Sequence, residues 1–228
     1  MYFIRDYDGP EPYRGGSSPD VLILGQDPTV DQSTRFAGVL GLEPSESSSE
    51  RESSPLQNYI FNKILMPLGI NRTRIIATNL VNLYYYDVPN RKIAKRYQDL
   101  IVNTAKREGI DVGKYPNKTN GAILHALNFK ARTQRDFEEI LKLPSICHLI
   151  TLGEPVFQVL MERYNLDLPP KIKEVLQTLS DKPPIIHISN REVSLLPLPH
   201  IFYENSPRWH FYTRFIDENL PLFSVWYM

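Results

Sequence analysis

Short apolar runs, each followed by polar residues, recur along the chain and predict buried β-strands. Four or five branched apolar residues in succession are too few for a helix, and they suit a strand that is covered on both faces of a parallel sheet. The three clearest runs span residues 21–24, 74–79 and 146–152. Two further runs, 184–189 and 192–196, are joined by Asn190-Arg191 and predict a hairpin.

Between these runs, apolar residues recur at helical spacing. The clearest case is residues 56–68, where apolar side chains recur every three or four positions and Gly69 follows. Pro155 begins a predicted helix that continues to Tyr164, because proline is favoured in a first helical turn. Further helices are predicted over 93–105, over much of 121–143, over 169–180 and after Pro207. Strands that alternate with helices indicate an α/β fold.

The remaining segments bound this domain. Residues 1–19 are rich in Gly, Pro, Tyr and Ser without an apolar period, and they predict an irregular N-terminal arm. Residues 43–55 are rich in Ser and Glu and predict a mobile surface loop. We therefore expect a single α/β domain over residues 20–228.

Composition narrows the functional classes. The 228 residues hold 26 Lys and Arg against 26 Asp and Glu, so net charge exerts no global attraction toward nucleic acid but permits a local basic rim. The single cysteine, Cys147, excludes a disulfide framework and a cysteine-ligated cluster. The five histidines have no metal-ligand spacing, so we expect no metal and no cofactor. Without a signal peptide or spanning segment, the expectation is a cytoplasmic monomer that does not bind membranes.

Polar side chains follow the predicted strands, at the edge where open α/β sheets bind ligands. Gln26 and Asp27 follow the first strand, with Gly25 expected to allow a sharp turn, and Asn79 ends the second. Each has a structural alternative, since Asp before Pro is common turn chemistry and Asn79 could cap a turn. Phe36 could anchor its loop, and His200 could be a surface histidine. His148, inside the third strand, is expected to be a core histidine with its hydrogen bonds satisfied.

The order of these motifs resembles the uracil-DNA glycosylase superfamily. The segment Val21-Leu22-Ile23-Leu24-Gly25-Gln26-Asp27-Pro28 is similar to the first glycosylase motif, and Arg35-Phe36-Ala37-Gly38 is similar to the loop that stacks on the base. Ser54-Pro55-Leu56-Gln57-Asn58 resembles the helix opening that follows that loop. Asn79 and His200 then stand in the positions of the base-reading Asn and the second catalytic motif. The resemblance covers roughly residues 20–219 and implies a three-layer α/β/α sandwich around a short parallel sheet.

The same resemblance implies a role for each residue. Asp27 would stabilise the cationic sugar and orient water, and His200 would stabilise the departing base anion. Gln26 would help through its backbone, Phe36 would stack on the base, and Asn79, in competition with Asn82, would read the base edge. Thr29 would lie beside position C5 of the base. The expected partner is duplex or single-stranded DNA with a damaged base, which residues past His200 would contact: Phe202 and Tyr203 as a wedge, with Asn205, Ser206 and Arg208.

Two departures leave other functions open. Thr29-Val30 stands where the uracil-specific enzymes have Tyr-His, and Ile201-Phe202 stands where they have Pro-Ser. These departures and the neutral charge favour an alternative, a catalytically silent module that binds nucleic acid or protein. The joint presence of Asp27, Asn79 and His200 favours an enzyme, a monofunctional glycosylase. A metal-free enzyme acting on free nucleosides is a third option, although it would not need an aromatic wedge.

Overall fold

The computed structural model describes about three fifths of the chain, and each structural statement below refers to that part. The described residues are 6–8, 12–25, 40, 42, 55–80, 83–85, 103, 106, 109, 111–112, 137–179, 182–188, 190–200 and 207–228.

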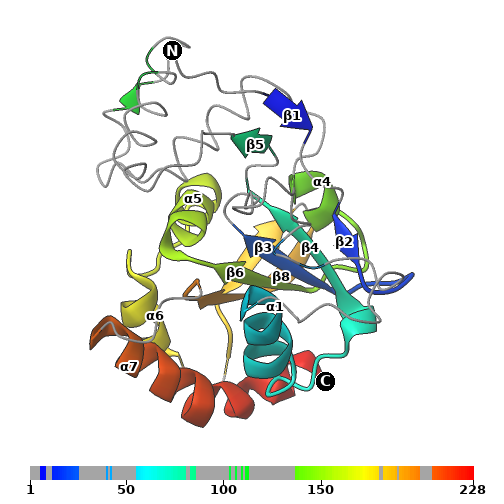
Figure 1. Cartoon of the computed structure of the whole chain (residues 1–228), viewed down its shortest axis with the longest axis vertical. Coiled ribbons are helices and arrows are strands. Elements are labelled where there is room, and N and C mark those ends of the chain that lie inside the picture. Colours follow the sequence, from blue (N-terminus) through cyan, green and yellow to red (C-terminus); the bar gives the residue numbers. More distant parts are fainter. Residues whose placement is uncertain are drawn as a thin grey trace.

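A mixed six-stranded sheet organises the fold, in the order β2-β4-β3-β6-β8-β7 (Figure 1). The four central strands are mutually parallel, and the two outer strands pair antiparallel to their neighbours. A separate pair joins β1 to β5. The strands are β1 Asp6–Asp8, β2 Tyr13–Arg14, β3 Val21–Gly25, β4 Ile75–Asn79, β5 Leu83–Tyr85, β6 His148–Leu152, β7 Ile185–Ile188 and β8 Arg191–Leu198.

The centre of the sheet is buried on both of its faces. Successive strand residues point to opposite faces, yet every residue of β3 and β4 is buried, so neither face is open to solvent at the centre. Near the carboxyl end of the chain, three helical segments follow one another without a break. The helices are α1 Pro55–Asn58, η3 Tyr59–Leu65, η4 Arg72–Arg74, α4 Phe137–Leu141, α5 Glu154–Tyr164, α6 Ile172–Thr178, α7 Pro207–Arg214, η6 Phe215–Asn219 and η7 Leu220–Tyr227.

The apolar patterns predicted most of these elements. The three central strands, the hairpin of β7 with β8 and the helix from Pro155 to Tyr164 are confirmed, as is the α/β class. The helix expected over 169–180 is shorter, since α6 spans Ile172–Thr178. The helix expected over 93–105 and most of the one over 121–143 lie outside the described residues, as does the surface loop 43–55.

The N-terminal arm and the sheet direction differ from expectation. Residues 1–19 are not wholly irregular, because β1 and β2 lie within them and β2 pairs antiparallel with β4. The sheet is consequently mixed and not purely parallel. Strands of two or three residues are too short to show a periodicity. The pairing of β2 follows from the free edge that β4 offers, whereas β1 pairs with β5.

At the amino ends of the strands, a polar cluster fixes the chain terminus. Arg74 donates three hydrogen bonds to Asp20, at 3.0, 3.2 and 2.6 Å, and one of 2.6 Å to the carbonyl oxygen of Tyr227. The ring of Tyr227 lies 4.7 Å from that of His148, whose Nδ1 is 2.7 Å from Ser194 Oγ. His148 is therefore a histidine with its Nδ1 hydrogen bond satisfied, as expected.

Candidate functional site

The carboxyl ends of the four parallel strands meet at one edge of the sheet. Gly25 at the end of β3 pairs in register with Asn79 at the end of β4. Across the sheet, Leu152 at the end of β6 pairs with Leu198 at the end of β8. Neighbouring strands are roughly 4.8 Å apart, so the backbones of β4 and β8 lie about 14 Å apart along this edge.

Asn79 presents a buried amide at this edge. Its side chain is 1% exposed, and neither Oδ1 nor Nδ2 has a hydrogen-bond partner in the described part of the chain. Burying an amide without a partner costs about 1–3 kcal/mol, so native structures seldom contain one without a functional reason. The Asn79 amide thus lies in an apolar core, and its donor and acceptor atoms can bind a ligand, a water molecule or another group.

Gly25 makes room for that amide. A β-carbon at Gly25 would lie 2.7 Å from Asn79 Oδ1 and 2.2 Å from Leu40 Cδ2, both too close for carbon. The φ angle of Gly25 is not positive, and the turn expected after it lies outside the described residues. Within the described part, the close packing of the Leu40 and Asn79 side chains accounts for glycine here. The amide of Leu80 donates 2.8 Å to the carbonyl oxygen of Gly25 and joins the two strand ends.

His200 lies just beyond β8 and is half-buried. Gly153, at the start of α5, donates its N–H to the carbonyl oxygen of Leu198 at 2.8 Å. A β-carbon at Gly153 would lie 3.5 Å from the β-carbon of His200, so the two backbones are close neighbours. The φ angle of Gly153 is +100°, a region that other residues rarely adopt.

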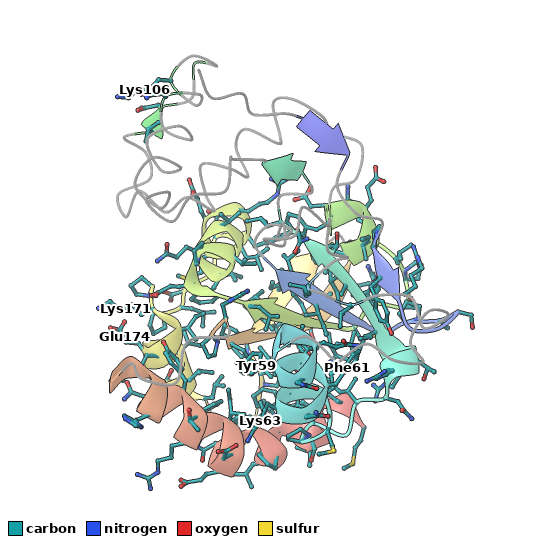
Figure 2. All side chains as sticks on the ribbon, viewed as in Figure 1. Tyr59, Phe61, Lys63, Lys106, Lys171 and Glu174 are labelled. Atoms are coloured by element: carbon teal, nitrogen blue, oxygen red, sulfur yellow. The ribbon has the colours of Figure 1, made fainter. Side chains whose placement is uncertain are left out.

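Tyr59 also contacts the segment that carries His200. It is buried in the helical run α1–η3 in front of the sheet, and its hydroxyl donates 3.0 Å to the carbonyl oxygen of Pro199 (Figure 2). Burial, with a smaller contribution from Tyr212, raises the pKa of Tyr59 far above its usual range. The hydroxyl therefore stays protonated and remains a hydrogen-bond donor at any physiological pH.

Two more unpartnered groups lie on the other face of the sheet. Thr78 and Thr151 flank Leu24 in register, and both are fully buried. Neither Oγ1 has a hydrogen-bond partner among the residues described. Since side chains in register share a face and successive residues alternate, these hydroxyls face away from the side on which Asn79 lies.

Of the residues expected at the site, the structure describes two in full. Asn79 and His200 both lie at the carboxyl edge of the parallel strands. Arg208 belongs to helix α7, and its side chain lies outside the described part. The other expected site residues are outside the described residues: Gln26, Asp27, Thr29, Phe36, Asn82, Phe202, Tyr203, Asn205 and Ser206.

Sequence reasoning missed the two residues that hold the His200 segment. Tyr59 follows Pro55-Leu56-Gln57-Asn58 directly, so its place in a predicted helix was visible in the sequence, but its hydrogen bond to Pro199 was not. Gly153 is the N-cap residue of α5 and has a positive φ angle. A single backbone angle of this kind produces no periodic pattern in the sequence, so it could not be predicted. Within the described ranges, no group of three His, Cys, Asp or Glu side chains is arranged to hold a metal ion.

Comparison with known proteins gives no independent assignment. No protein-family model matches the chain, and no curated protein matches it. In the part of the chain that the structure describes, no helix has both the length and the apolar character needed to cross a membrane.

Proposed function

We propose that this chain is a monofunctional DNA glycosylase, a divergent member of the uracil-DNA glycosylase superfamily with its three-layer α/β/α fold. The observation that supports the proposal most is the unpartnered, buried amide of Asn79 at the carboxyl end of β4. An amide in that position can satisfy its hydrogen bonds on a ligand inserted at the sheet edge, and the strand beside it continues directly into Gln26-Asp27.

An Asn side chain suits recognition of a uracil edge. Its amide offers one acceptor and two donor hydrogens in one plane, and uracil presents an acceptor at O4 beside the donor at N3. Cytosine reverses that pair, so the wrong base would leave buried polar groups unpaired, which discriminates strongly. The base would have to leave the DNA stack to reach this edge.

Asp27 and His200 would share the chemistry. As the N-glycosidic bond breaks, positive charge develops on the sugar and negative charge on the departing base. The Asp27 carboxylate would stabilise the sugar cation and orient the attacking water. The His200 imidazole would donate a hydrogen bond to O2 of the base anion. The hydrogen bond from Tyr59 and the packing of Gly153 support this role, because both restrain the backbone at His200.

The test is a panel of oligonucleotides, single-stranded and duplex, that carry one uracil, hypoxanthine, xanthine or thymine mispaired with guanine. Abasic sites are scored by alkaline cleavage. We expect abasic sites from uracil, and rate losses on the order of 10²–10³ in the variants Asp27→Asn and His200→Gln. Asp167→Asn and His187→Gln are matched controls, because both residues are exposed and lie outside the site.

The same panel separates the proposal from its alternative. If no oligonucleotide gives abasic sites, the glycosylase assignment is wrong. Fluorescence anisotropy with the same oligonucleotides then tests the catalytically silent module, which the zero net charge favours. Cleavage of free deoxyuridine in preference to DNA would indicate a nucleoside hydrolase.

A further inference from the structure

A hollow lies between α6 and the helices at the end of the chain, separate from the carboxyl edge of the sheet. We name it the C-terminal groove, and its volume is about 580 Å³. None of the residues that line it belongs to the candidate site. The lining consists of Leu176, Gln177, Leu179, Phe211, Phe215, Asn219, Leu222, Phe223, Val225 and Trp226.

Aromatic rings form a continuous row along this groove. The ring centroids of Phe211 and Phe215 are 6.4 Å apart, those of Phe215 and Phe223 are 5.9 Å apart, and those of Phe223 and Trp226 are 4.2 Å apart. Leu222 and Val225 also line the groove and remain 67% and 64% exposed. Large apolar side chains on the surface that also line a hollow are typical of binding sites.

Most charged side chains near the groove are neutralised in pairs. Lys171 pairs with Glu174 on α6, where Figure 2 labels both. On the facing helices, Arg214 pairs with Glu218, and Asp217 pairs with Lys63 of η3. In each of these pairs the two opposite charges neutralise one another, so the pair attracts a charged ligand only weakly.

Lys173 is different, because it has no carboxylate partner among the described residues. Its ammonium lies 5.1 Å from the centroid of the Phe211 ring, which lines one end of the groove. A cation over an aromatic face keeps its full charge and part of its hydration. Within the described residues, the groove is thus an apolar, aromatic channel with one positive charge, that of Lys173, which has no carboxylate partner there and lies at the Phe211 end.

We propose that the C-terminal groove binds a free medium-chain carboxylate, with the alkyl chain along the row of rings and the carboxylate near Lys173. The volume lies in the range of small-molecule sites, which are mostly apolar with a few polar groups. A helical peptide, by contrast, needs anchor pockets spread over two turns. Gln177 and Asn219 are the polar side chains in the lining, and they can hydrogen-bond the carboxylate or water around it.

The experiment is isothermal titration calorimetry with sodium decanoate as the probe, and with decanol and hexanoate for comparison. We expect one molecule of decanoate per chain and weaker binding of decanol. Hexanoate should bind at least about tenfold more weakly, because each buried methylene contributes several-fold to the affinity. Lys173→Gln should weaken decanoate binding about two- to fivefold and leave decanol unchanged. Lys171→Gln is the matched control on the same helix and should change neither.

A second variant tests the groove without disturbing the core. Leu222 is largely exposed, so Leu222→Ser should fold normally and weaken decanoate, decanol and hexanoate alike. Binding should also change the fluorescence of Trp226, and Trp226→Phe should abolish that change. Equal affinity for decanoate and decanol in the unaltered protein, or no saturable binding, would overturn the proposal. Binding that ignores Leu222→Ser but follows Lys173 would place the ligand outside the groove.

Discussion

The hydroxyl of Tyr59 donates a 3.0 Å hydrogen bond to the carbonyl oxygen of Pro199, which joins residues 140 positions apart. Pro199 is buried and immediately precedes His200. The bond therefore restrains the position of the His200 backbone relative to the carboxyl edge of the sheet. Proline has no N–H of its own, so the carbonyl is the one backbone hydrogen-bonding group that Pro199 offers.

Our first prediction concerns this bond. Tyr59→Phe keeps the ring but leaves the Pro199 carbonyl buried without its donor, which should cost about 1–3 kcal/mol of unfolding free energy. If the proposed function holds, kcat for uracil release should also fall on the order of tenfold, with KM little changed, because His200 loses its position. Urea denaturation and single-turnover kinetics measure the two effects.

Tyr227→Phe provides the matched control for this prediction. Tyr227 is as buried as Tyr59, but its hydroxyl has no hydrogen-bond partner among the described residues. Removing it should leave the unfolding free energy unchanged or slightly raised. The imidazole nitrogen signals of His200 in NMR spectra should shift in Tyr59→Phe and not in Tyr227→Phe. Identical spectra in both variants would contradict the positioning role, whatever the activity.

The sequence predicted the parts of this fold that depend on local pattern. Runs such as residues 21–24 identify central strands, because a strand buried on both faces must be apolar throughout. The start of helix α5 could be located from Pro155. The edge strand β2 could not, because two residues carry no period and their pairing depends on the free edge of β4. Local pattern thus predicted the centre of the sheet and the hairpin of β7 with β8, and it did not predict the opposite edge at β2.

The same division applies to the candidate site. Asn79 and His200 could be found because they end predicted strands, and strand ends of parallel sheets bind ligands. Tyr59 could not be linked to His200, since a hydrogen bond between residues so far apart in sequence has no local signature. The close packing at Gly25 could not be predicted either, because a glycine required by neighbouring side chains has no signature in the local sequence.

The second prediction follows from that close approach. Gly25→Ala would set a β-carbon 2.7 Å from Asn79 Oδ1, so the amide must move. We expect a loss of about 1–3 kcal/mol in unfolding free energy, typical of overpacking. If the proposed function holds, discrimination of uracil over cytosine should fall as well, because base reading and this packing both depend on the position of the Asn79 amide. An Ala variant as stable as the original protein would show that the packing around Gly25 relaxes freely.

A third prediction concerns pH. Burial, and to a smaller extent Arg74, lowers the pKa of His148 below its usual 6.5, whereas Asp20 acts in the opposite direction. The folded protein thus binds a proton at His148 less readily than the unfolded chain does. Stability should be fully present above about pH 6.5 and should fall as the pH drops from there toward the folded-state pKa.

Urea denaturation across this pH range measures the effect. His148→Gln should flatten the dependence, because the group that takes up the proton is gone. His187→Gln is the matched control, since His187 is exposed on the edge strand β7 and should leave the slope unchanged. A slope that survives in His148→Gln would assign the pH dependence to another residue.

The last prediction sets stability against function at Asn79. Asn79→Leu replaces an unpartnered buried amide with an apolar side chain of similar shape, which should raise the unfolding free energy by about 1 kcal/mol. If the proposed function holds, the same variant should lose recognition of uracil, because no donor or acceptor remains to read the base edge. Thr78→Val is the matched control: its buried hydroxyl is also unpartnered, but it lies on the opposite face of the sheet. That variant should gain stability and keep uracil cleavage.

Two outcomes would contradict this prediction. Loss of stability in Asn79→Leu would mean that the amide already has a partner in the free protein. Equal loss of cleavage in both variants would mean that Asn79 has no special role in reading the base.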